Sequence, residues 1–168
     1  DKFLSFPLFP KDADVAESVT EILEAEDITV HTGCKATAVS QDADGTIHLT
    51  IESPNGHSEI TGSHLLAAVG RRPNSANLGL ATVGVEINER GYINTNEQLQ
   101  TNVTGIWAIG DVNGRGAFTH TSYHDHEIVM DTIAGIERQV SDRNMAYAMY
   151  IDPPLGRVGM SEKQARES

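Results

Sequence analysis

The chain has 168 residues, of which 39% are hydrophobic, and its 12 basic and 24 acidic residues give a formal net charge of −12. Such a composition is typical of a globular protein rather than a disordered one. The acidic balance argues against nucleic acid or an anionic membrane as partner, and no apolar run approaches the roughly 18 residues of a membrane span. The single cysteine, Cys34, excludes an internal disulfide and a cysteine-rich metal site, so we expect a cytoplasmic protein.

The first 60 residues predict one helix followed by short strands. Asp12 or Asp14 is a candidate cap for a helix on which Val19 takes an apolar position. Asp-Gly and Asn-Gly pairs farther along are typical of tight turns between paired strands. We expect strands over residues 28–31, 35–41, 46–52 and 57–60, the last three forming an antiparallel meander.

Two apolar runs predict strands buried on both faces, residues 65–69 (LLAAV) and 106–109 (IWAI). A polar connector should link them, with one short strand at residues 92–94. Beyond them we expect a helix over residues 119–134 with Ile128, Val129 and Ile133 inward, a polar loop over 135–144, a strand over 147–151, and a capping box at Ser161 and Gln164. The chain stops within about two turns of that box, which suggests a fragment of a longer protein.

The stretch TGIWAIGDVNGRG, residues 104–116, delivers an acid at the end of an apolar run. Asp111 can accept hydrogen bonds from sugar or ribitol hydroxyls, and the glycines after it allow the backbone to approach a ligand. Thr119 is a candidate cap for the next helix, whose first amides would then face a negatively charged group. The same residues also fit a tight turn whose aspartate only caps the helix.

A second stretch, AAVGRRPN, places Arg71 and Arg72 after the first apolar run. Alone, such a pair is more often solvated on the surface than part of a ligand clamp. Together with TNVTGIWAIGD downstream, it resembles the paired signature of the flavin-dependent pyridine nucleotide-disulfide oxidoreductases, which include glutathione reductase, lipoamide dehydrogenase and mercuric reductase. FTHTSYHDHEIVMD and PPLGRVGMSEKQARES resemble the bacterial reactive-chlorine-resistance branch of that family.

The resemblance implies an α/β fold made of partial, doubly wound FAD- and NAD(P)-binding domains with an antiparallel meander, plus the start of an α+β dimerisation domain. Residues 1–70 would be the C-terminal part of the NAD(P)-binding domain, 71–144 that of the FAD-binding domain, and 145–168 the opening of the dimerisation domain. The implied parent is a homodimer that passes hydride from NAD(P)H through FAD to a disulfide, a metal ion or another small-molecule acceptor.

The resemblance also implies which residues bind the cofactors. Asp111 would bind the ribitol side of FAD, with Gly110 beside it. Gly70 would lie beside the nicotinamide cofactor, and Ala36 would touch it. Arg71 belongs to the same cofactor-binding set. The residues implied along the flavin, with the helix N-terminus near its pyrimidine ring, are Ala117, Phe118, Thr119 and His120.

Several features of the resembled family do not occur in the 168 residues. There is no C-x-x-x-x-C pair, no glycine-rich phosphate loop and no late His-Glu base pair. We therefore expect binding residues without catalytic ones, and a chain that is inactive by itself. Two alternatives stay open: a flavin reductase or oxidase of similar fold without the cysteine pair, and a non-enzymic nucleotide-binding module.

The histidines His120 and His124 raise the question of a metal site. They are four residues apart on one helical face, a spacing that can hold a transition metal. The sequence offers no further soft ligand nearby, and two partly exposed histidines beside a cofactor cleft explain the pattern without a metal. We therefore predict no metal site.

Overall fold

The structure is a computed structural model that describes residues 2–4 and 13–168, with the backbone alone for residues 2–4. The described chain divides into two compact units. The first contains the described residues up to Ala68, with residues 148–155 and 160–168, and the second contains residues 69–147 and 156–159. None of the helices in the described ranges is long and apolar enough to cross a lipid bilayer.

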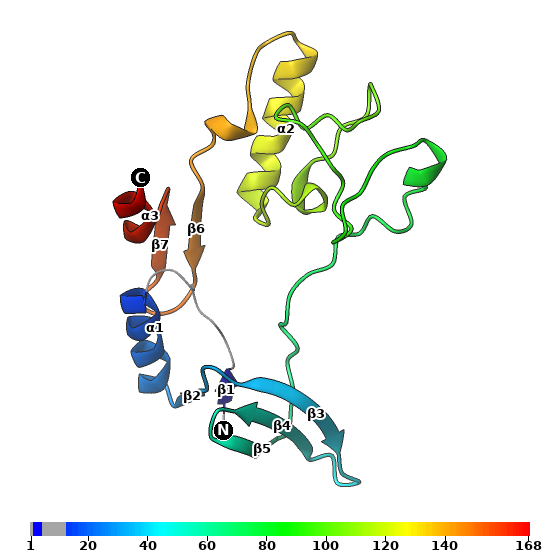
Figure 1. Cartoon of the computed structure of the whole chain (residues 1–168). Helices are drawn as coiled ribbons and strands as arrows, with labels where there is room; N and C mark the ends of the chain where they lie inside the picture. Colours follow the sequence, from blue (N-terminus) through cyan, green and yellow to red (C-terminus); the bar gives the residue numbers. More distant parts are fainter. Residues whose placement is uncertain (1, 5–12) are drawn as a thin grey trace. The chain divides into compact units, whose positions relative to one another are not determined.

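The first unit begins with a strand, a helix and a parallel strand. β1 (Lys2–Leu4) pairs in parallel with β2 (Ile28–Val30), and α1 (Ala13–Ala25) connects them, as Figure 1 shows. Val19 is 2% exposed, so it anchors the buried side of α1. Asp14 lies inside the first turn of α1 rather than capping it. The other candidate cap, Asp12, lies outside the described residues.

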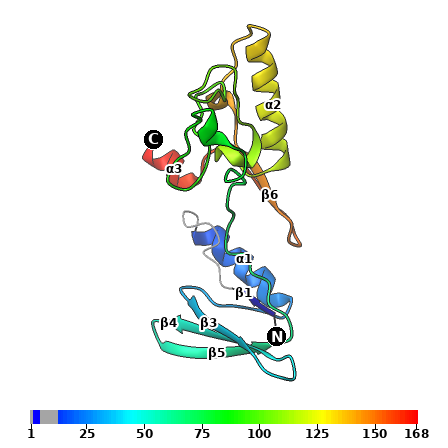
Figure 2. The same cartoon turned by 90° about the vertical axis from the view of Figure 1, so that its right-hand side faces the viewer.

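The expected antiparallel meander is confirmed. β3 (Lys35–Gln41), β4 (Ile47–Ser53) and β5 (Gly56–Gly62) form one sheet in that order, which Figure 2 shows from the side. The turns are formed where glycines adopt positive φ, +91° at Gly45 and +110° at Gly56, conformations that other residues rarely adopt. The Asp-Gly and Asn-Gly pairs in the sequence therefore predicted the positions of both hairpin turns.

The second unit is built mainly from loops around a small core. Val85, Ile93 and Ala108 are each at most 7% exposed and pack together. Two of these three come from the stretch that the sequence presented as a polar connector, so that expectation was incomplete. The helices of the second unit are the 3₁₀ helices η1 (Leu80–Thr82), η2 (Gly110–Asn113) and η3 (Val140–Asp142), and the α-helix α2 (Thr119–Ile133).

Two asparagines shape the loops that carry this core. The side-chain oxygen of Asn96 accepts hydrogen bonds from the backbone amides of Gln98 (3.0 Å) and Gln100 (2.9 Å). Asn88 binds the amides two and four residues after it in the same way. Such turns satisfy backbone groups locally, which allows Leu99 to be fully buried in a segment without strands.

The expected buried strand over residues 65–69 is wrong. These residues form no regular element, and Leu66 and Val69 are 88% and 95% exposed. An apolar run becomes a buried strand only where neighbouring strands supply hydrogen bonds and cover, and no strand in the described part of the chain pairs with this one.

The strands expected over residues 106–109 and 92–94 are also replaced by irregular structure. Each segment contributes one isolated bridge, Trp107 with Gln100 and Ile93 with Ile87. The first bridge consists of the bonds from Ala108 N to the Leu99 carbonyl (3.1 Å) and from Thr101 N to the Ile106 carbonyl (2.9 Å). Ile109 is 44% exposed, so the run is buried on one side only.

The helix predicted over residues 119–134 is confirmed as α2, with two corrections. Ile128 is fully buried and Val129 is half-buried, but Ile133 is 61% exposed because it lies in the last turn, beyond the core. Thr119 is the first helical residue rather than the cap, and Phe118 takes the cap position without a side-chain hydrogen bond.

The last elements include the expected strand, which covers residues 146–149 rather than 147–151, and the expected helix, with a second strand between them that was not predicted. β6 (Ala146–Met149) and β7 (Leu155–Val158) form a two-stranded sheet, and α3 (Glu162–Glu167) follows. The capping box is confirmed, because Ser161 Oγ accepts from the amide of Gln164 (3.2 Å) and Gln164 Oε1 accepts from the amide of Ser161 (2.9 Å).

Candidate functional site

A cavity of about 660 Å³ lies in the second unit, around the turn η2. Three segments of the chain meet there: the end of the glycine-arginine stretch, the short segment at Tyr92, and the loop that runs from η2 to the start of α2. The lining residues are Arg71, Arg72, Pro73, Asn74, Tyr92, Ile109, Gly110, Asp111, Val112, Gly114, Gly116, Ala117 and Ser122.

Arg71 and Asp111, 40 residues apart in the sequence, meet at this cavity. Arg71 Nη1 donates to Asp111 Oδ2 (2.7 Å) and to the carbonyl oxygen of Ala117 (2.9 Å). Both charged side chains are more than half exposed, so the ion pair contributes little to stability. The ion pair matters for the geometry of the site instead. By binding both Asp111 and Ala117, the Arg71 guanidinium joins the glycine-arginine stretch to both ends of the loop that runs from η2 to α2. Arg71 is thus not a merely solvated arginine.

The glycines of the loop bring the backbone close to its neighbours. Gly110 and Gly114 have φ of +74° and +71°, in the region that favours glycine. A Cβ at Gly110 would lie 2.8 Å from Ser122 Oγ, and a Cβ at Gly114 would lie 3.0 Å from the ring of Tyr92. Because Gly110, Gly114 and Gly116 line the cavity, backbone atoms alone form this part of its wall, against which a flat or extended ligand can lie.

The N-terminus of α2 follows this wall. The first bond of the helix near the cavity runs from Ser122 N to the Phe118 carbonyl (3.0 Å). By helix geometry, the amides of residues 119–121 precede that bond and have no acceptor within the helix. They carry the partial positive charge of the helix dipole, which favours an oxygen or an anion nearby. An acceptor carboxylate and a donor cluster thus lie on one short loop.

Phe118 and His120 lie beside the cavity rather than in its lining. Their rings stack with centroids 5.3 Å apart, and Phe118 also stacks on Tyr147 at 5.8 Å. His120 Nε2 lies 2.7 Å from the Ala146 carbonyl oxygen, so the ring donates there through that nitrogen. These contacts join the start of α2 to the first two residues of β6.

The predicted residues fall into three groups: those that line the cavity, those at the start of α2, and the remaining two, Gly70 and Ala36. Gly110, Asp111, Ala117 and Arg71 line one cavity, whereas Phe118, Thr119 and His120 continue from it into α2. Gly70 precedes Arg71 and has φ of +124°. Ala36 lies exposed on β3 in the first unit and is not among the lining residues.

The two histidines of the metal question have separate partners. His124 Nδ1 accepts a hydrogen bond from Arg143 Nε (3.1 Å), while His120 binds a backbone carbonyl. The pKa of His124 lies below its ordinary value, first because burial disfavours the charged ring and next because Arg143 is positively charged. Within the described ranges, no group of three or more His, Cys, Asp or Glu side chains is placed to hold a metal ion.

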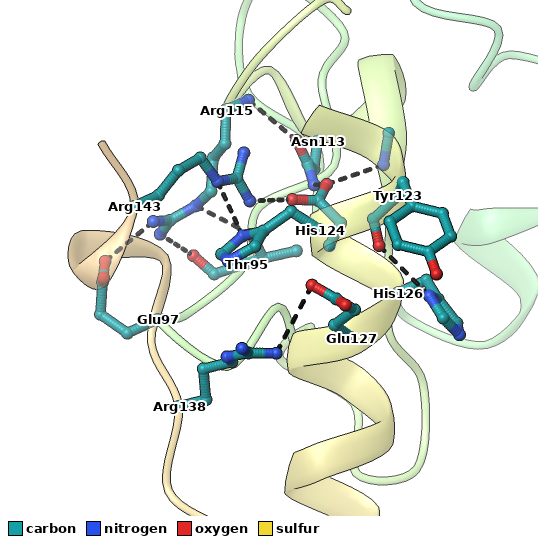
Figure 3. Close-up of polar contacts among 12 residues, drawn as sticks. Thr95, Glu97, Asn113, Arg115, Tyr123, His124, His126, Glu127, Arg138 and Arg143 are labelled. Carbon is teal, nitrogen blue, oxygen red and sulfur yellow. Dashed lines mark hydrogen bonds and ion pairs between the residues drawn. The ribbon is translucent and has the colours of Figure 1, made fainter. Parts of the chain in front are cut away.

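A buried polar network, which the sequence analysis missed, supports the loop from behind. Asp125 on α2 is fully buried and accepts hydrogen bonds from the Gly110 amide and from Asn113 Nδ2, both at 2.8 Å. Arg143 pairs with its other carboxylate oxygen. Figure 3 shows Asn113, His124 and Arg143 gathered along one side of α2. The available signal was the spacing of Asp125, which shares a helical face with the buried residues Thr121 and Ile128.

A second arginine fixes the far end of the loop. Arg115 binds Glu97 Oε1 through Nη1 (2.8 Å) and the Thr95 carbonyl through Nη2 (2.7 Å), contacts that Figure 3 also draws. The hydrogen bond from Arg115, with a further one from the Ser141 amide, holds the pKa of Glu97 below its ordinary value. Both ends of the loop that carries Asp111 are thus fixed by charged groups.

Comparison with known proteins gives consistent matches. The sequence profile of the family "Pyridine nucleotide-disulphide oxidoreductase" matches residues 3–125. The probable pyridine nucleotide-disulfide oxidoreductase RclA of Escherichia coli is 34% identical over 160 residues, covering 94% of this chain and 35% of the relative. A mercuric reductase of Streptomyces lividans is 33% identical over 159 residues, covering 94% and 33%.

The fold comparison agrees with the sequence comparison. The solved structure of the HOCl-induced flavoprotein disulfide reductase RclA from Escherichia coli superposes with a TM-score of 0.86 and 34% identity, over 99% of this chain and 38% of that one. The chain spans about a third of the length of the curated relatives that it matches.

Proposed function

Because the chain belongs to the pyridine nucleotide-disulphide oxidoreductase family, which uses FAD and NAD(P)H, we propose that its η2 cavity is part of an FAD site. The protein in which it works passes a hydride from NAD(P)H through FAD to an acceptor. The relatives include a disulfide reductase and a mercuric reductase, so the acceptor classes are a disulfide or a metal ion. The length of these relatives supports a larger flavoprotein of which the chain is one segment.

The observation that carries this proposal is the position of Asp111. Its carboxylate lies in a cavity with a wall of glycine backbone, a few residues before the N-terminus of α2. When bound, the flavin supplies the redox chemistry. Asp111 would accept a hydrogen bond from a ribitol hydroxyl, and the amides that begin α2 would favour an electron-rich group. Arg71 orients the carboxylate through its bond to Oδ2.

We assign the nicotinamide cofactor to the side of Gly70, with Ala36 contributing from β3. The domain boundaries that we propose for the larger protein are residues 1–70, 71–144 and 145–168, for nicotinamide binding, flavin binding and dimerisation. Exposed apolar side chains in the last segment support an interface there, since Tyr150 is 94% and Val158 is 72% exposed. Light scattering on the full-length flavoprotein should give twice its monomer mass, and a stable monomer would contradict the dimer.

The test of the flavin site is FAD titration of the apoprotein of the full-length flavoprotein. A charge-assisted hydrogen bond is worth about 1.5–3 kcal/mol, so Asp111→Ala should weaken FAD binding about ten- to a hundredfold. Asp111→Asn keeps one acceptor oxygen and should lose less. The matched control is Asp44→Ala, because Asp44 accepts from the Thr46 amide in a turn of the other unit. It should lower thermal stability and leave FAD affinity unchanged.

Asp111 could instead serve only to stabilise its own turn. In that case Asp111→Ala would behave like Asp44→Ala: the melting temperatures of apo and holo protein would fall equally and FAD affinity would not change. That result would overturn the proposed flavin site.

A further inference from the structure

Asp125 and its neighbours form a support for η2 that lies outside the lining of the cavity. Asp125 Oδ2 accepts from the amide of Gly110 and from Asn113 Nδ2, both at 2.8 Å. These two donors lie on either side of Asp111 in the sequence. A single carboxylate oxygen therefore holds both ends of the turn whose middle carries the flavin-binding group.

The support extends beyond that oxygen. Asn113 Nδ2 also donates to the Ala108 carbonyl (3.0 Å), and Asn113 Oδ1 accepts from the amide of Arg115 (2.8 Å). Arg143 Nη2 pairs with Asp125 Oδ1. The Asp125 side chain is 1% exposed and that of Arg143 is 7% exposed, so water does not compete for these bonds. The turn is thus fixed through a chain of buried, mutually bonded groups.

We propose that Asp125 and Arg143 are positioning residues for FAD binding, which they control through the orientation of Asp111. This inference rests on the proposed flavin site. Neither residue lines the cavity, so neither needs to touch the cofactor. Arg143 fixes the Asp125 carboxylate, Asp125 fixes η2, and η2 aims Asp111, because the strength of a hydrogen bond falls steeply with distance and angle.

The donor count explains why an acidic residue is required at position 125. Three donors converge on its side chain, from Gly110, Asn113 and Arg143. A carboxylate offers two acceptor oxygens, whereas an asparagine offers one and turns its NH₂ group towards a donor. Asp125→Asn should therefore loosen η2 while conserving the size of the side chain.

The experiment is a double-mutant cycle in the full-length flavoprotein, read as FAD affinity of the apoprotein. Asp125→Asn should weaken FAD binding roughly three- to tenfold when Asp111 is present and change it less than about twofold in an Asp111→Ala background. The matched control is Asp131→Asn on the same helix, where Asp131 pairs with Arg138 at 3.1 Å, and it should leave FAD affinity unchanged in both backgrounds.

Melting temperatures of the apoproteins are measured alongside the cycle. If Asp125 had a purely structural role, the pattern of FAD affinities across the cycle would differ. If the support acts only on stability, Asp125→Asn will weaken FAD equally in both backgrounds or not at all, and either result overturns the inference. Should Asp125→Asn fail to fold, Arg143→Lys replaces it, because lysine keeps the charge and loses the planar fork. It should show the same non-additivity. An Asp111→Ala variant with unchanged FAD affinity would instead refute the proposed flavin site.

Discussion

Replacing Gly116 with alanine is expected to destabilise the second unit, because the new methyl group has no room. A Cβ at Gly116 would overlap the Cγ2 methyl of Thr121 and lie 3.1 Å from Thr121 Cβ and Oγ1. Thr121 is 1% exposed in the first turn of α2, so it cannot move aside freely. Overpacking costs typically about 1–3 kcal/mol, and each kcal/mol lowers the melting temperature of a chain of this size by about 2–4 °C. We therefore expect a fall of about 2–12 °C.

The chain contains a matched control and a rescue. Gly156 has no heavy atom near its Cβ position and no positive φ, so Gly156→Ala should be neutral or stabilising by up to about 1 kcal/mol. Thr121→Ser removes the methyl group that Gly116→Ala would overlap. The double variant should therefore be more stable than the sum of the two single effects.

Thermal melts followed by circular dichroism measure all four variants of this set. Equal melting temperatures for Gly116→Ala and Gly156→Ala would refute the close packing of the loop against α2. A double variant with strictly additive losses would refute Thr121 as the group in contact.

Two further predictions concern pH. The hydrogen bonds that the His48 ring donates to Glu59 and Asp42 raise the pKa of His48 above its ordinary value of 6.5. The stabilisation is therefore complete below that value and is lost as pH rises through the higher folded pKa. His48→Gln should lower the melting temperature at about pH 5.5 and converge with the wild type near pH 9. The pKa of Glu97 is lowered from 4.5, chiefly by the hydrogen bond from Arg115. The stabilisation that Glu97 contributes is therefore present above that value and is lost as pH falls through the folded pKa. Glu97→Gln should lower the melting temperature at about pH 7 and leave it unchanged below about pH 3. Parallel pH–melting curves for variant and wild type would contradict either prediction.

Elements specified by local residues were predictable from the sequence. The hairpins of β3, β4 and β5 follow from Asp-Gly and Asn-Gly turns, and the start of α3 follows from Ser161 and Gln164. Asp111 and Gly110, which line the cavity, were singled out because a carboxylate after an apolar run is a local pattern. These signals need no information about distant parts of the chain.

Elements that depend on distant partners were not predictable. An apolar run such as residues 65–69 predicts a strand only where other strands pair with it. The burial of Val85 and Ile93 could not be predicted, because they lie in a polar stretch that is folded by asparagine turns rather than by strands with alternating apolar residues. The bond between Arg71 and Asp111 joins residues 40 positions apart, a separation over which composition and spacing carry no signal. Asp125 was missed because aspartate is usually exposed, whereas this one is fully buried.

The central claim, that Asp111 binds a ribitol hydroxyl of FAD, is tested most directly by changing the ligand and the residue together. The measurement is the affinity of the full-length apoprotein, wild type and Asp111→Ala, for FAD and for FAD analogues lacking single ribityl hydroxyls. For one analogue, the loss caused by Asp111→Ala should shrink from about ten- to a hundredfold to less than about twofold, since the bond is already absent. An equal loss for FAD and for every deoxy analogue would contradict the claim.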